Sequence, residues 1–254
     1  SRLFKFLPKF LTDHMLSNII YFRKIKKKKL DSDNYKIDSN FKYNFNKTVK
    51  FNNYDLEKTH FVYPNLKLLI NLLFSNNKVN FLDYGAGEIK NYLRFKKNKK
   101  IDYYYKDQID YEKYYKKKLN QNIYPNFYIY DEKKNTKFDF IYFGSSFQYL
   151  NNVENILKSI ITSKTKYILL SGIIIYENKN LDYFVCEQLN LAENKINLFF
   201  YDKSYLNKLF KKYGFKLMNI SINKSDQFIN FKNFNENNIG YYDLLYKKWK
   251  KKIY

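Results

Sequence analysis

The sequence predicts an α/β protein with a doubly wound, mostly parallel sheet of seven strands and a helical extension on its N-terminal side. Two observations carry this prediction. From Val79 onward, short apolar runs alternate with turn residues and helical patterns, as expected for a parallel sheet with helices on both faces. The chain has only six glycines, and two of them, Gly85 and Gly87, directly follow the first of these apolar runs.

The pattern of apolar and turn residues changes near residue 77. Residues 1–77 contain no glycine, and we interpret them as an extension of helices and loops packed on the core. Their clearest helical pattern runs from Pro64 to Phe74, whereas the polar stretch from Asp31 to Asn53 is typical of a loop or cap. Residues 78–254 are then predicted to form a single α/β domain.

Seven strands and two clear helices are expected in that domain. The strands are predicted at residues 79–83, 101–105, 127–130, 138–143, 167–170, 216–222 and 240–246. One helix is expected over residues 153–162, where apolar side chains recur at helical spacing. A second is expected over residues 203–213 and ends at Gly214, as a helix C-cap does.

The formal net charge of +23 has two interpretations. Clustered cations gain affinity for nucleic acid through counterion release, so the run Lys24–Lys29 is a candidate surface for RNA or an anionic membrane. Only three of the 47 basic residues are arginine, and lysine is accompanied throughout by Asn, Ile, Tyr and Phe. This bias is expected from an AT-rich genome, and a charge run is usually a solvated face.

The remaining composition narrows the class of protein. With a single cysteine, Cys186, the chain forms no intrachain disulfide and no cysteine-rich zinc site, so we expect no metal. No uncharged apolar stretch approaches the roughly 20 residues that span a bilayer. We expect a soluble protein in the cytoplasm.

The turn after the first strand is the candidate binding loop, because ligands of doubly wound sheets bind beyond the carboxyl ends of the strands. It reads Asp83-Tyr84-Gly85-Ala86-Gly87. Its glycines permit positive φ and close approach of a ligand to the backbone. A dinucleotide-binding fingerprint needs a third glycine where Lys90 stands. The acid two residues before the first glycine suits a sulfonium cofactor better.

Three later strand ends carry further candidates. Asp107 follows the second strand and lies about 20 residues after Gly87. Its carboxylate is placed either to bind a ribose diol or to begin a helix near Tyr111. Asp131, after the third strand, is placed near an adenine amine or belongs to an ordinary polar turn. After the fourth strand, Gly144, Ser145 and Ser146 are small enough to leave room for an acceptor.

Several segments together resemble a known family. They are Phe81–Gly87, Ser145–Leu150, Glu187–Gln188, Asn197–Tyr201 and Lys212–Phe215. With these segments the chain resembles a family of class I methyltransferases associated with bacterial surface-polysaccharide genes, over roughly Leu3 to Ile220. Members of that family often carry glycine where this chain has Ala86 and Ile89.

The resemblance implies S-adenosylmethionine as cofactor and a sugar or other small polar molecule as methyl acceptor. The cofactor would be bound by Asp83, Tyr84, Gly85, Ala86, Gly87, Asp107, Asp131, Gly144 and Ser145. Gln148, Tyr149 and Gln188 would line the acceptor side and act in catalysis. Aromatic residues around Gln188, among them Phe199 and Phe200, would offer a sugar faces on which to stack. In the alternative interpretation, Phe199 and Phe200 are core residues and Gln188 caps a turn.

Two other functions stay open from the sequence. One is an RNA methyltransferase or RNA-bound assembly factor that uses the lysine-rich surface. The other is a methyltransferase-like interaction module without catalysis. The chain lacks the Asn-Pro-Pro-aromatic motif of amino-base methylation, and Cys186 has no preceding proline for cytosine C5 chemistry, which disfavours those two nucleic-acid methyltransferase classes.

Overall fold

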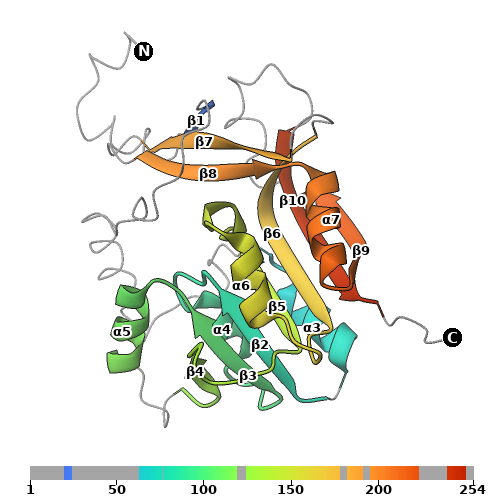
Figure 1. Ribbon diagram of the computed structural model, residues 1–254. Coiled ribbons are helices and arrows are strands. Elements are labelled where there is room, and N and C mark those ends of the chain that lie inside the picture. Colours follow the sequence, from blue (N-terminus) through green and yellow to red (C-terminus); the bar gives the residue numbers. More distant parts are fainter. Residues whose placement is uncertain are drawn as a thin grey trace, which may run out of the picture.

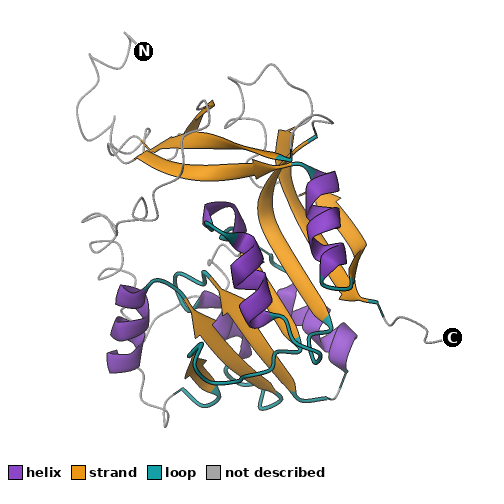
Figure 2. Ribbon diagram, in the orientation of Figure 1, coloured by secondary structure: helices purple, strands orange, loops and turns teal. Residues whose placement is uncertain are grey.

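The computed structural model describes residues 20–24, 63–75, 77–118, 124–177, 182–190, 195–222 and 239–249 (Figures 1 and 2). The strands are β1 (Ile20–Lys24), β2 (Val79–Tyr84), β3 (Ile101–Lys106), β4 (Phe127–Ile129), β5 (Phe140–Gly144), β6 (Tyr167–Tyr176), β7 (Tyr183–Asn190), β8 (Lys195–Tyr201), β9 (Phe215–Ile222) and β10 (Ile239–Lys248). The helices are α3 (Leu66–Phe74), α4 (Lys90–Phe95), α5 (Ile109–Lys118), α6 (Val153–Ile160), α7 (Lys203–Lys212) and the short 3₁₀ helix η3 (Phe147–Tyr149).

All described strands belong to one ten-stranded sheet in the order β1-β7-β8-β6-β5-β2-β3-β4, with β10 joining β6 to β9. The central strands β6, β5, β2, β3 and β4 run parallel. Two antiparallel additions both attach at β6. One is β10 with β9, and the other is the ribbon of β8, β7 and β1, in which β8 meets β6 in parallel. The predicted class, an α/β fold with a mostly parallel sheet, is confirmed.

Side chains of the central strands alternate between two hydrophobic cores, which is why helices cover both faces (Figure 2). On β2, Leu82 packs into the core beneath α6 and α7, whereas Phe81 packs into the core beneath α3, α4 and α5. On β5, Ile141 faces the first core and Phe140 the second. Each such side chain, fully buried, stabilises the fold by roughly 1.5–3 kcal/mol.

All seven predicted strands are present, as β2, β3, β4, β5, β6, β9 and β10. The predicted count of seven is nevertheless wrong, because β1, β7 and β8 extend the sheet. The β1 strand also falls within the extension that was predicted as helices and loops. In the β1–β7 ladder, Phe22 pairs with Gln188. A local apolar pattern does not predict pairing between segments so far apart in the sequence.

The β6 strand is longer than predicted because antiparallel pairing with β10 continues where the parallel sheet ends. The change occurs at Gly172, whose φ is +62°, opposite a shift of register between Tyr242 and Leu244. The intervening Asp243 accepts hydrogen bonds from the Gly172 amide at 2.9 Å and the Ser171 hydroxyl at 2.6 Å. This bulge carries β6 beyond the parallel core, where β8 joins it.

The helices are short, and α7 shows how the sequence sets their limits. The Asp202 carboxylate caps its first turn by accepting from the Ser204 and Tyr205 amides at 2.7 and 3.3 Å. As predicted, the helix ends at Gly214, whose φ is +79°. The longest described helices, α5 and α7, have ten residues each, and no described helix has the length and apolar content needed to cross a bilayer.

Candidate active site

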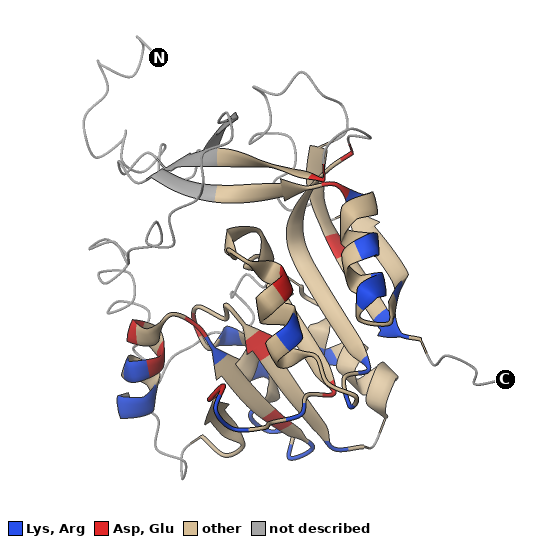
Figure 3. Cartoon of the chain, viewed as in Figure 1, with Lys and Arg blue, Asp and Glu red and all other residues tan. Residues whose placement is uncertain are grey.

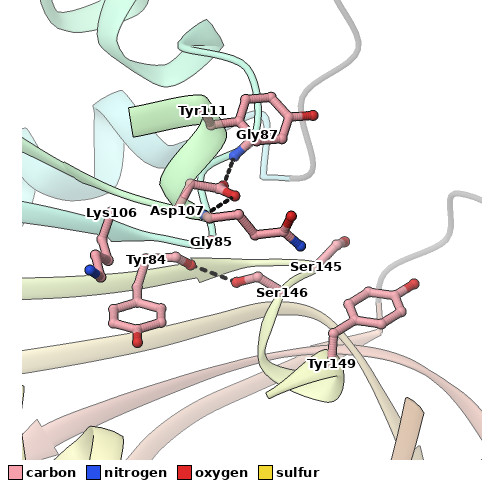
Figure 4. A pocket seen from close by; sticks show the side chains of 10 residues that line it. Tyr84, Gly85, Gly87, Lys106, Asp107, Tyr111, Ser145, Ser146 and Tyr149 are labelled. Atoms are coloured by element: carbon pink, nitrogen blue, oxygen red, sulfur yellow. Dashed lines mark hydrogen bonds between the residues drawn. The ribbon is translucent and has the colours of Figure 1, made fainter. Parts of the chain in front are cut away.

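A pocket of about 320 Å³ lies beyond the carboxyl ends of β2, β3 and β5 (Figure 4). It is lined by Tyr84, Gly85, Gly87, Lys106, Asp107, Gln108, Tyr111, Ser145, Ser146 and Tyr149. Three segments supply these residues: the turn after β2, the turn from β3 into α5, and the turn from β5 into η3. This is the edge at which parallel doubly wound sheets bind their ligands.

The two glycines of the first turn have different roles. Both have positive φ, +71° at Gly85 and +58° at Gly87. A Cβ atom at Gly85 would lie 2.4 Å from the Cβ of Ser146, so the loop packs against the third turn only because this side chain is missing. A Cβ atom at Gly87 would meet nothing within 4 Å. Gly87 therefore leaves open space at the pocket.

The Asp107 carboxylate joins the first and second turns. Its Oδ2 accepts from the Gly87 amide at 2.5 Å, and its Oδ1 accepts from the Gln108 amide at 2.7 Å (Figure 4). On the other side of the loop, the Tyr105 hydroxyl donates to the Gly87 carbonyl at 2.7 Å. Burial raises the pKa of Asp107, although the two backbone donors oppose that rise. The pocket thus contains a positioned carboxylate.

Asp83 lies beneath the loop and does not line the pocket, although the sequence predicted it as a cofactor contact. Its carboxylate is 1% exposed. Oδ2 accepts from the Tyr103 hydroxyl and from Asn91 Nδ2, the latter at 2.9 Å, while Oδ1 has no hydrogen-bond partner among the described residues. Burial raises the pKa of Asp83 to about 6 against these two donors, and the charge of Asp107 adds to the rise. Asp83 ties the end of β2 to β3 and α4.

The third turn places Ser145, Ser146 and Tyr149 at the pocket. Ser145 has a φ of 53° and its amide donates to Ser171 in the neighbouring β6 at 2.7 Å. The Ser146 hydroxyl donates to the Tyr84 carbonyl at 2.6 Å and so links the third turn to the first. Gly144, predicted as a cofactor contact, is not among the residues that line the pocket.

The predicted acceptor residues are separated in the structure. Tyr149 lines the pocket, and Figure 4 shows it at the opposite end from Tyr111. Gln148 is 2% exposed and outside the lining, with its Nε2 donating to the Gly172 carbonyl at 3.3 Å and its Oε1 unpartnered among the described residues. Gln188 pairs with Ile196 in the β7–β8 ladder, and its side chain lies outside the described residues.

Two other predicted cofactor residues lie away from the lining. Ala86 packs beside the core beneath α3, α4 and α5. Asp131 is exposed and its Oδ1 accepts from the Lys133 amide at 3.0 Å, which is the geometry of the polar turn considered as its alternative. Phe200 is a core residue, as its alternative interpretation held. Residues 25–29 of the basic run lie outside the described residues.

Lys106, Gln108 and Tyr111 line the pocket but were not predicted as site residues. Their positions next to Asp107 in the sequence could have predicted them, because residues that flank a ligand-binding acid lie in the same turn. Lys106 also bridges Glu112 at 3.2 Å and Glu132 at 3.3 Å, which holds the β3 turn against α5 and the segment after β4.

The parallel sheet and its two helical layers give this chain the same fold as solved methyltransferase structures. Solved structures of similar shape include a coclaurine N-methyltransferase with N-methylheliamine and S-adenosylhomocysteine, with TM-score 0.55, 12% identity and coverage of 94% of this chain and 86% of that one. A 1,6-didemethyltoxoflavin-N1-methyltransferase of Burkholderia thailandensis has TM-score 0.53, 8% identity and coverage of 90% and 95%.

A third structure of this shape is the N-terminal domain of EvdMO1, determined in the presence of S-adenosylhomocysteine and D-fucose. It has TM-score 0.51 and 11% identity, and the match covers 72% of this chain and 81% of that one. At these identities the similarity establishes the fold alone. No protein-family model and no curated protein matches the sequence.

Proposed function

We propose that this protein is an S-adenosylmethionine-dependent methyltransferase that acts on a sugar or another small polar acceptor. The observation that carries the proposal is the pocket at the strand ends, where the open space beside Gly87 meets the carboxylate of Asp107. Its volume of about 320 Å³ falls within the range of roughly 300–1,000 Å³ that is usual for small-molecule sites.

The lining fits this cofactor. A Cβ atom at Gly87 would enter open space, so the backbone there is free for close approach by a bound molecule. Asp107 Oδ1 and Oδ2 each accept one backbone hydrogen bond and keep further acceptor capacity for a ribose diol. When bound, S-adenosylmethionine supplies a methyl group on a positively charged sulfur. The protein then contributes mainly the alignment of the acceptor with that methyl group.

We place the acceptor beside Tyr149. The ring of Tyr149 offers an apolar face on which a sugar can stack, and its hydroxyl offers a polar end. Gln148 serves as a positioning residue, because its hydrogen bond to Gly172 fixes η3 against β6. Gln188 of β7 is proposed as a further acceptor contact.

Calorimetry with S-adenosylmethionine tests the cofactor assignment. The wild-type protein should bind. Gly87→Val should abolish binding, because the new side chain fills the open space and strains the loop at its φ of +58°, and circular dichroism should show that the chain stays folded. Asp107→Ala should weaken binding by roughly 1.5–3 kcal/mol, the scale of hydrogen bonds to a charged group. The matched control is Asp110→Ala, an exposed acid of α5 outside the lining. Unchanged affinity in folded Gly87→Val would refute the assignment.

Methyl transfer to nucleotide-linked or lipid-linked sugars tests the acceptor assignment. Tyr149→Ala and Gln188→Ala should lower the turnover while cofactor affinity stays at the wild-type value. Full turnover in both variants would place the acceptor elsewhere. Transfer to RNA in place of sugars would favour the first alternative from the sequence, and the absence of cofactor binding would favour the non-catalytic module.

A further inference from the structure

A second and larger cavity lies at the other edge of the sheet from the cofactor pocket. It is formed where β6 begins, β9 begins and β10 ends, whereas the pocket lies beyond the carboxyl end of β5, which is parallel to β6. Its volume of about 1,170 Å³ exceeds the roughly 1,000 Å³ at the upper end of small-molecule sites. The cavity is therefore better suited to a segment of an extended molecule than to a single metabolite.

The cavity is strongly basic. Five of its twelve lining residues are lysines, although the whole chain has 44 lysines among 254 residues. The lining contains a single acid, Asp139, which is 2% exposed and lies 3.2 Å from Lys164 Nζ and 3.6 Å from Lys166 Nζ. One carboxylate balances one of the five charges, so the cavity keeps a formal charge of +4. Figure 3 shows this concentration of basic residues at the start of β9.

Aromatic rings accompany the lysines. Lys216 Nζ lies 5.9 Å from the ring centroid of Trp249, and Lys247 Nζ lies 5.9 Å from that of Tyr167. Trp249 is the only tryptophan of the chain and is 67% exposed. Its backbone amide donates to the Gly214 carbonyl at 2.8 Å, which fixes the residue beside the end of α7. The cavity therefore has a large exposed indole on a hydrogen-bonded backbone, with the ammonium group of Lys216 beside it.

We propose that this cavity binds single-stranded nucleic acid without sequence preference. Lysine ammonium groups act as point charges toward phosphates, and an exposed indole provides a face on which an unpaired base stacks. The lining has no arginine, the residue that reads base edges by paired hydrogen bonds, so the cavity recognises the backbone and the stacking surface. A strand bound here is held at the far edge of the sheet, away from the methyl-transfer pocket.

Titration with a short labelled oligouridylate tests the proposal, with anisotropy as the readout of affinity. Binding should weaken with salt, and Lys247→Gln should lower the slope of log affinity against log salt by about 0.7, the value for one phosphate contact on a single strand. Lys117→Gln, an exposed lysine of α5 outside the cavity, is the matched control and should leave the slope unchanged.

Tryptophan fluorescence tests stacking directly, because Trp249 is the only indole. The oligonucleotide should quench it, Trp249→Ala should weaken binding about tenfold, and Trp249→Phe should retain it. Equal binding of duplex nucleic acid or of heparin, with no effect of Trp249→Ala, would replace the proposal with a general polyanion surface. The absence of salt-dependent binding by the full chain would overturn it outright.

Discussion

The buried carboxylate of Asp83 should make this protein less stable as the pH rises from acid to neutral. Its pKa is about 6 in the folded protein and 3.8 in the unfolded chain, chiefly because burial penalises the charge. Between these two values the folded state binds more protons than the unfolded state. The free energy of unfolding therefore falls as pH rises through this window, and the stabilising contribution is complete only below the unfolded pKa.

The magnitude follows from the size of the shift. One pKa unit corresponds to 1.36 kcal/mol, so a rise of about two units costs roughly 3 kcal/mol when Asp83 is fully ionised. Between pH 4.5 and 7.5 the part that is lost is about 2 kcal/mol. Asp83→Asn removes the titration but keeps the shape of the side chain, so the variant should lack this loss.

Urea unfolding of both proteins at the two pH values measures the effect. The free energy of unfolding of the variant also differs from that of the wild type by a constant amount, because an amide replaces the carboxylate whose Oδ1 has no hydrogen-bond partner among the described residues. This difference does not change with pH. Titrating groups that do not interact with Asp83 are shared and cancel when the two pH dependences are subtracted. A difference of about 2 kcal/mol is expected, with the wild type losing more stability. Parallel pH profiles would refute the reasoning and show that Asp83 stays ionised in the fold.

Two further predictions concern stability. Gly85→Ala should destabilise the fold by about 2–5 kcal/mol, since positive φ and the overlap with Ser146 act together, whereas Gly87→Ala should cost only about 1–2 kcal/mol of backbone strain. Thermal melts should therefore rank Gly85→Ala clearly lower, and the reverse order would contradict the loop geometry. Asp202→Ala should remove the cap of α7 and lower the melting temperature by about 2–4 °C, the equivalent of about 1 kcal/mol. An unchanged melting temperature would show that the cap adds nothing to stability.

The parallel part of the fold could be predicted because its signals are local. Each central strand is a short, mostly apolar run that is followed by a turn, and the burial of most residues of β2 and β5 explains this composition. The strands β7 and β8 contain aromatic and β-branched residues, but the sequence interpretation assigned those aromatics to an acceptor site. The partner of β7 is β1, more than a hundred residues away, and no local pattern encodes such a pairing.

The site was predictable to the extent that backbone geometry defines it. Gly85 and Gly87 stand out because glycines are rare in this chain, and Asp107 stands out by its spacing from them. The burial of Asp83 and Gln148 behind the lining was not predictable, because it depends on how Tyr103 and Gly172 of neighbouring strands approach them. A sequence shows which side chains are polar, but the packing of adjacent strands decides which of them reach the cavity.

The attachment of the ribbon formed by β1, β7 and β8 has a consequence for cooperativity. Within the described strands, its ladder meets the rest of the sheet at the pair Ile175 and Tyr201, beyond the bulge at Gly172. Because so little of the ribbon's backbone is paired with the rest of the sheet, amide hydrogens of β7 and β8 should exchange at a lower free energy than those of β2 and β5. Tyr149 packs against a hydrophobic cluster that β7 and β8 share with β6 and β10, whereas Asp107 is held by the Gly87 and Gln108 amides. Opening of this ribbon alone would therefore remove the packing of Tyr149 on the acceptor side of the pocket, while the cofactor side around Asp107 stays folded.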